Sequence, residues 1–196
     1  MSTEHDKGDI DIKIDVAKFH NAYKKMAEGI NDMVFGHIAV KKKAMACVAE
    51  FGKGNFDAPL EKFPGKKAFI NDTIEAVRVN LKNVAEQVGI LIDASSGGNL
   101  QKRANANIFE GDWRKLVEGL NNILNAVVTP INEAVNVMQT MSTGDLTEKV
   151  KGDYAGDYKV LKDAINNSLE SINDILSQVN QSVEQVNSGA IQVSDA

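Results

Sequence analysis

Residues 30–54 read INDMVFGHIAVKKKAMACVAEFGKG, and the spacing of their apolar side chains decides the fold. From Ile30 to Phe51 a stripe of mostly apolar residues repeats at alternating steps of three and four, with His37 as its polar member. Such heptad spacing is typical of an α-helix that packs against other helices along one face. Gly54 follows, and glycine is the residue best suited to the left-handed conformation that closes a helix.

The same pattern occurs four times along the chain. Each copy also has an apolar residue at an equivalent place in its helix, namely Ile30, Ile74, Leu120 and Ile165. The first three of these residues lie 24 residues before the next closing glycine. The distance from each closing glycine to the next of these apolar residues varies, which predicts a helix of fixed register and a surface connector of variable length. The closing glycine is followed by Asp or Asn, which favours a turn, and by a large apolar residue. These signatures are Gly8-Asp9-Ile10, Gly54-Asn55-Phe56, Gly98-Asn99-Leu100 and Gly144-Asp145-Leu146, at intervals of 46, 44 and 46 residues.

The repeat predicts four helical units, at residues 1–37, 38–83, 84–129 and 130–176, and a coiled coil over residues 177–196. We expect the chain to start inside the first connector, and each second helix to continue as the first helix of the next unit. A connector of about a dozen residues reaches about 40 Å when extended, whereas a helix of sixteen residues is about 24 Å long. The two helices of a unit can therefore be parallel, although the connector length does not require it.

Composition limits the function classes. The 196 residues carry a net charge of −5 and are 43% hydrophobic, with no apolar run long enough to span a bilayer. Without a basic excess we expect no nucleic-acid binding, and we expect no membrane contact within this segment. The single Cys47 rules out an internal disulfide and fits a reducing compartment. We therefore expect a cytoplasmic location for this segment, with the full-length protein either soluble or anchored in the inner membrane.

Residues in the last third resemble a HAMP domain of bacterial sensory receptors, namely Thr129-Pro130-Ile131, Gly144-Asp145-Leu146 and Ile165-Asn166. The stretch from Gly8 to Lys67 is similar to the poly-HAMP part of soluble aerotaxis-type receptors. The tail from Asn173 onward resembles the coiled coil that follows HAMP in methyl-accepting chemotaxis proteins. The family's Asp-Glu-x-Gly motif is reduced here to the acidic residue of Gly111-Asp112 and of Gly156-Asp157.

This resemblance implies an all-α fold of tandem HAMP units, each a parallel four-helix bundle formed by homodimerisation, that leads into a C-terminal coiled coil. It implies a signal relay that transmits conformational change from a sensory domain to a kinase-control coiled coil. A chemotaxis histidine kinase and its coupling protein would be partners through regions outside this segment. Two alternatives stay open, a HAMP array of a sensor histidine kinase and a passive coiled-coil spacer.

Catalytic chemistry has little support in the sequence. His5, His20 and His37 share no metal-ligand spacing with one another or with Cys47. Gly52-Lys53-Gly54 lacks the Gly-Lys-Ser/Thr ending of a phosphate-binding loop and follows a predicted helix instead of a strand. We expect no enzymatic activity, no catalytic residue, no cofactor and no metal.

We expect signalling to depend on the stripe and on the connectors. Pro130 predicts a bend, because proline removes a helical hydrogen bond. His37 allows two interpretations: a partly buried histidine that sets the register, or a protonatable weak point whose charging loosens one packing. Phe63 and Trp113 are expected to cover the bundle. The stripe candidates are Ile30, His37, Ile74, Leu81, Leu120, Val127, Pro130, Ile165 and Ile172, and the connector candidates are Gly8, Ile10, Ile14, Gly54, Phe56, Leu60, Gly98, Leu100, Gly144, Leu146 and Val150.

Overall fold

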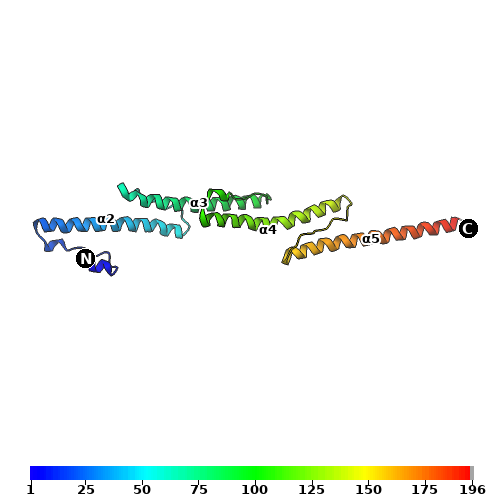
Figure 1. The fold of residues 1–196 in the computed structure, drawn as a ribbon, viewed down its shortest axis with the longest axis horizontal. Coiled ribbons are helices and arrows are strands. Elements are labelled where there is room, and N and C mark those ends of the chain that lie inside the picture. Colours follow the sequence, from blue (N-terminus) through cyan, green and yellow to red (C-terminus); the bar gives the residue numbers. More distant parts are fainter. Residues whose placement is uncertain (195–196) are drawn as a thin grey trace. The chain divides into compact units, whose positions relative to one another are not determined.

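The computed structural model describes residues 1–194, in which helices alternate with extended connectors and no β-strand occurs (Figure 1). A short helix, α1, precedes four long helices, and three connectors carry a single 3-10 turn. The bounds are α1 Ser2–Asp6, α2 Asn21–Gly52, α3 Ala68–Ser96, α4 Gly111–Ser142 and α5 Gly156–Ser194, with the turns η1 Val16–Lys18, η2 Gly65–Lys67 and η3 Ala106–Ile108. The predicted all-α architecture is confirmed.

Helix α1 corrects one expectation about the first connector. Residues 2–6 are helical, and the backbone N–H of Gly8 donates to the carbonyl of His5 at 2.9 Å. Gly8 therefore closes a helix, as the later signature glycines do, and the chain does not start inside a connector.

The signature glycines end the helices in the way the sequence predicts. Gly54 has a φ of +85°, and its N–H donates to the carbonyl of Phe51 at 2.9 Å. The N–H of Asn55 then reaches back to the carbonyl of Glu50 at 3.0 Å, which completes a Schellman closure. The Asn55 side chain accepts from the N–H of Asp57, so the next residues turn away from the helix axis. Gly8, Gly98 and Gly144 also have positive φ values, whereas Gly52 lies in the helix and Gly97 has no positive φ.

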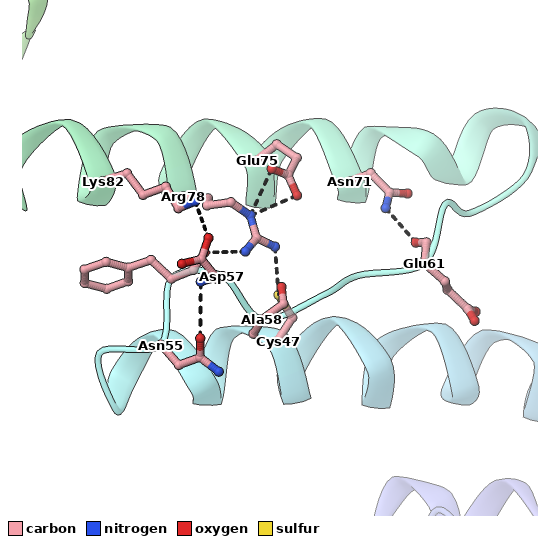
Figure 2. A network of polar contacts seen from close by, with 10 residues as sticks. Cys47, Asn55, Asp57, Ala58, Glu61, Asn71, Glu75, Arg78 and Lys82 are labelled. Carbon is pink, nitrogen blue, oxygen red and sulfur yellow. Dashed lines mark hydrogen bonds and ion pairs between the residues drawn. The ribbon is translucent and has the colours of Figure 1, made fainter.

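The chain forms two compact parts, residues 1–89 and 90–196. In the first part, the connector runs back along α2: Asn55 bonds to Glu50, Ala58 to Cys47 and Glu61 to Lys43. Helix α3 meets the same connector in reverse order, since Asn71 lies beside Glu61 and Lys82 pairs with Asp57 (Figure 2). Helices α2 and α3 are therefore parallel, as the connector length permitted.

One apolar cluster sits between α2, α3 and this connector. Its buried members come from α2 (Ala44, Cys47 and Phe51), the connector (Ala58 and Phe63) and α3 (Ile74), and Phe56 and Leu60 pack against it. Phe63 thus covers the helix pair, as predicted, while Trp113 is partly exposed.

The second part repeats this arrangement between α4 and α5. Val137 of α4, Val150 of the connector and Leu169 of α5 form a buried cluster, with Leu146 and Ile165 beside it. Helix α4 continues through Pro130 without a break in its helical assignment, so a bend there stays a prediction. Each of α2 to α4 also ends at a signature glycine, as expected if one unit's second helix continues as the next unit's first. The unit boundaries at 37/38, 83/84, 129/130 and 176/177 all fall inside continuous helices and stay predictions.

No helix in the described range combines the length and the apolarity needed to cross a bilayer.

Candidate functional site: the connector clamps

One asparagine side chain holds each connector to the helix that follows it. The amide oxygen of Asn121 accepts from the N–H of Ala104, and its amide nitrogen donates to the carbonyl of the same residue, both at 2.9 Å. The pairs Asn31–Ile14 and Asn166–Val150 repeat this geometry at 2.9–3.0 Å. In all three units the connector residue lies six positions after the closing glycine. An extended segment with no neighbouring strand thus finds partners for its backbone groups in a side chain.

The second unit is clamped in a different register. Asn71 accepts from the N–H of Phe63 at 2.9 Å and donates to the carbonyl of Glu61 at 2.8 Å, so its two bonds reach different residues. It is the fourth residue of α3, whereas the other three clamp asparagines are each the eleventh residue of their helix. Aligned on the asparagines, Ile70 is the equivalent of Ile30. The equivalence of Ile74 and Ile30 rests on their shared 24-residue distance to the next closing glycine, whereas the clamp asparagines place the counterpart of Ile30 about one helical turn earlier.

The carbonyl two residues after the closing glycine receives a side-chain donor in three units, from two different places. In the second and fourth units the donor comes from the following helix, seven residues after the clamp asparagine. In the third unit it comes from the connector itself. The pairs are Phe56–Arg78, Leu146–Asn173 at 3.2 Å and Leu100–Arg103 at 2.7 Å.

Arg78 is the most connected of these donors (Figure 2). Its Nε donates to both carboxylate oxygens of Glu75, at 2.9 and 3.1 Å, and its guanidinium also donates to the carbonyl of Phe56 and to the Sγ of Cys47, the latter at 3.4 Å. The ring of Phe51 lies 4.8 Å from the guanidinium carbon. Among the residues whose burial the structure describes, Arg78 is the only buried side chain that carries a formal charge. A charge out of water is tolerated when it is fully hydrogen-bonded, and Arg78 has partners on α2, on the connector and on α3.

Ion pairs flank the connector of the second unit. Lys82 pairs with Asp57, and this hydrogen bond is the main reason that the pKa of the Asp57 carboxyl is lowered. Lys43 pairs with Glu61 at 2.5 Å. All four side chains are about half exposed or more, so these pairs add little stability.

In the fourth unit a carboxylate of α4 holds the end of the connector. Glu133 accepts from the hydroxyl of Tyr154 at 2.5 Å and from the backbone N–H groups of Lys151 and Gly152, at 2.6 and 3.0 Å. The Tyr154 hydroxyl is the largest cause, and the Lys151 N–H the next, of a lowered pKa of Glu133. The same bond raises the pKa of Tyr154.

Part of the apolar stripe of the second helices lies away from the connectors, whereas Ile74 is buried against one. The side chains of Met26, Met33 and Ile123 are each about 60% exposed. In contrast, Val117 on the connector side of α4 is fully buried. The stripe in front of Gly54 behaves differently: Ala44, Cys47 and Phe51 are buried within the chain, and Met45 and Val48 are exposed. An apolar face with heptad spacing is thus left uncovered along the second helices.

The predicted signalling residues divide between these two environments. Ile74, Pro130 and Val150 are buried. Ile30, His37 and Ile10 are exposed, so any burial of His37 requires another chain. The remaining apolar candidates are partly buried, namely Leu81, Leu120, Val127, Ile165, Ile172, Ile14, Phe56, Leu60, Leu100 and Leu146.

Metal or nucleophilic chemistry finds no arrangement to support it in the described residues. No three His, Cys, Asp or Glu side chains come together in a way that could hold a metal ion within residues 1–194. The Cys47 thiol is buried against the carbonyl of Ala58 and the Arg78 guanidinium.

Comparison with known families agrees with this geometry. Residues 40–82 match the family model described as HAMP N-terminal domain 3, and residues 108–174 match the HAMP domain model. The chain carries tandem HAMP domains. The first match contains the clamp of Asn71 and the Arg78 network. The second match contains the clamp of Asn166 on Val150, and it contains Asn121 but not its partner Ala104.

The chain is also similar to a chemoreceptor. It is 40% identical over 86 residues to the methyl-accepting chemotaxis protein McpB of Pseudomonas aeruginosa. The match covers 44% of this chain and 13% of that relative, so it compares a HAMP-bearing segment with a small part of a longer receptor.

Of the four clamp asparagines, only Asn166 is among the residues that the sequence singles out, although all four share one sequence signal. Asn follows an apolar residue at Ile30-Asn31, Ile70-Asn71, Leu120-Asn121 and Ile165-Asn166. Asparagine is a poor residue for a helix interior because its side chain competes for backbone groups. Its recurrence inside four predicted helices therefore needed a specific partner, and the connector backbone is that partner.

Proposed function

We propose that this segment relays a conformational signal within a chemoreceptor and that it works as a parallel homodimer. The observation that carries the proposal is the uncovered apolar face along the second helices, opposite the clamped connectors. Its members Met26, Met33 and Ile123 are each about 60% exposed on a single chain. Burying a side chain of this kind gains about 1.5–3 kcal/mol, so the face favours association.

A second copy of the same chain is the partner that fits this face. The two helices of a unit are already parallel, and heptad spacing allows an identical helix to pack in register against the stripe. Helix α5 continues beyond the last connector with exposed Ile175, Val179, Val183 and Val186, at coiled-coil spacing. Its residues 175–194 include a single charged side chain, Glu184, so little charge opposes pairing with an identical copy.

Disulfide cross-linking tests the dimer face directly. In the full chain with Cys47→Ala, Ile123→Cys lies on the proposed face, and Asn122→Cys lies on the polar side of the same helix turn. We expect Ile123→Cys to form covalent dimers under mild oxidation and Asn122→Cys to remain mostly uncross-linked. Equal cross-linking of both variants contradicts the assigned face.

Relay would arise if each unit had two packings of similar energy and an input at one end biased them. The two clamp registers support the idea that units with the same topology can be held differently. We propose that the input is of the aerotaxis type. The output would go to a chemotaxis histidine kinase and its coupling protein, through regions outside this segment. A sensor-kinase HAMP array is the alternative, which the downstream sequence decides.

A passive spacer is distinguished from a relay by coupling over distance. A stable heptad coiled coil joined ahead of Met1 in two different registers imposes two rotations on the first unit. The readout is the ratio of dimer cross-linking at Ile165→Cys to that at Ser168→Cys, in the Cys47→Ala chain. A relay changes this ratio between the two fusions, and a passive spacer leaves it the same.

A further inference from the structure

In the second unit a buried arginine donates to the carbonyl two residues after the closing glycine. Where another unit has a side-chain donor to this carbonyl, the donor is a smaller or a more exposed group. The donor in the second unit is Arg78, whose side chain is 11% exposed. At the equivalent position, counted from the clamp asparagine, the first and third units have Ile38 and Val128, and the fourth unit has Asn173. A buried apolar residue is therefore compatible with this position elsewhere in the chain.

The connector of the second unit has no side-chain donor at the place that the third unit uses. In the third unit the donor is Arg103, five residues after the closing glycine. The same place in the second unit is Pro59, which has no hydrogen-bond donor at all. The carbonyl of Phe56 thus depends on a side chain from the opposite helix.

Arg78 binds all three segments of the unit through one rigid group. The planar guanidinium presents its donors in a fixed fork, and Glu75 on the same helix orients it, so it cannot keep its bonds to the Phe56 carbonyl and to Cys47 if α3 rotates or slides. Leaving a buried polar group without a hydrogen-bond partner is unfavourable, and more so when the group is charged. A packing in which α3 has moved relative to α2 and the connector would break the bonds of the guanidinium to Cys47 and to the Phe56 carbonyl.

We infer that Arg78 is a positioning residue that latches the connector of the second unit to both helices and holds this unit in one packing. The inference rests on the proposed relay and deepens it, because it assigns to the second unit a higher energetic cost of changing its packing than the other units have. Apolar side chains at this position, as in the first and third units, would allow neighbouring packings at lower cost.

Hydrogen exchange on the full chain tests the latch with a graded set of variants. Arg78→Val copies the third unit, and Arg78→Asn copies the fourth, where the amide of Asn173 bonds the equivalent carbonyl. Ile74→Val is the matched control, because it trims the same buried cluster of the same helix without touching a polar group. For Arg78→Val we expect amides in residues 55–63 to exchange at least tenfold faster, with amides of α2 and α3 within about twofold of wild type. For Arg78→Asn we expect the connector to stay close to wild type.

Three results would overturn the inference. The first is no change in the connector of Arg78→Val. The second is uniform loosening of α2, α3 and the connector in the pattern of Ile74→Val, which would make Arg78 an ordinary core residue. The third is that the connector amides of Arg78→Asn exchange as fast as those of Arg78→Val. If the valine variant does not fold, the asparagine variant is compared with wild type alone, and a connector that exchanges at least tenfold faster than wild type overturns the inference. The exchange pattern is read within one chain, so a failure of the latch is distinguishable from a failure of the dimeric relay.

Discussion

The ring of Tyr154 lies across Gly152, in the space that a Cβ at residue 152 would occupy. Glycine is needed here for close approach, because the Tyr154 hydroxyl must reach Glu133 over the connector backbone. Gly152→Ala should force the ring away and weaken that bond, with a loss of about 1–3 kcal/mol in unfolding free energy measured in urea. Gly189→Ala is the control: the site is open and helical, so alanine there should stabilise by about 0.5–1 kcal/mol. Equal effects of the two substitutions would contradict the assignment.

The clamp asparagines give a second prediction. Asn121→Ala leaves both backbone groups of Ala104 without their protein partner, which should cost about 2 kcal/mol. Asn122→Ala changes the same residue type one position away on an exposed surface, and it should alter unfolding by less than about 0.5 kcal/mol. Urea unfolding of the two variants checks the difference. A neutral Asn121→Ala would show that the connector does not need its clamp.

The third prediction concerns the end of α2, where Gly52 and Gly54 differ in backbone conformation. Gly54 has a φ of +85°, in a region that side chains rarely adopt, so Gly54→Ala should destabilise by about 1–2 kcal/mol. Gly52 lies two residues earlier in helical conformation with open space around it, so Gly52→Ala should be neutral or stabilising. Thermal unfolding of the two variants provides the test, and the reverse order would be incompatible with the closure described.

Glu133 gives a prediction about pH. Its pKa is lowered in the folded chain, first by the Tyr154 hydroxyl and then by the Lys151 N–H. The stabilisation it provides is therefore complete above the pKa of an unfolded glutamate, about 4.3, and is lost as the pH falls through the lower folded value. The wild type should lose more stability between pH 6 and pH 3 than Glu133→Gln, in urea unfolding at each pH. Parallel pH profiles for the two proteins would remove this role for the carboxylate.

Much of the fold could be predicted from the sequence because it rests on periodic signals. The heptad stripe marks the long helices, and the Gly-Asp/Asn signature marks where three of them close, as the positive φ of Gly54 shows. The register of the second unit could not be predicted from apolar residues alone. Ile70 and Ile74 both fit a heptad stripe, and only the bonds of Asn71 to the connector decide between them.

The polar contacts of the site were harder to predict for a physical reason. Hydrogen bonds across 16 to 31 residues, such as Arg78 to Cys47, depend on how the connector folds back and leave no periodic trace. From the sequence alone, Arg78 is expected to be a surface residue of its helix. Only the structure shows that its partners on α2 and the connector bury it. The exposed His37 shows the opposite case, because its stripe position predicts burial that a single chain does not provide.

The central claim is that two copies of this chain lie side by side and cover the apolar face that one copy leaves open. Light scattering during size-exclusion chromatography of the full chain measures this most directly. The account predicts a mass of about 43 kDa, twice the 21.3 kDa of one chain, at micromolar concentration. A well-folded helical protein of about 21 kDa under the same conditions would contradict it.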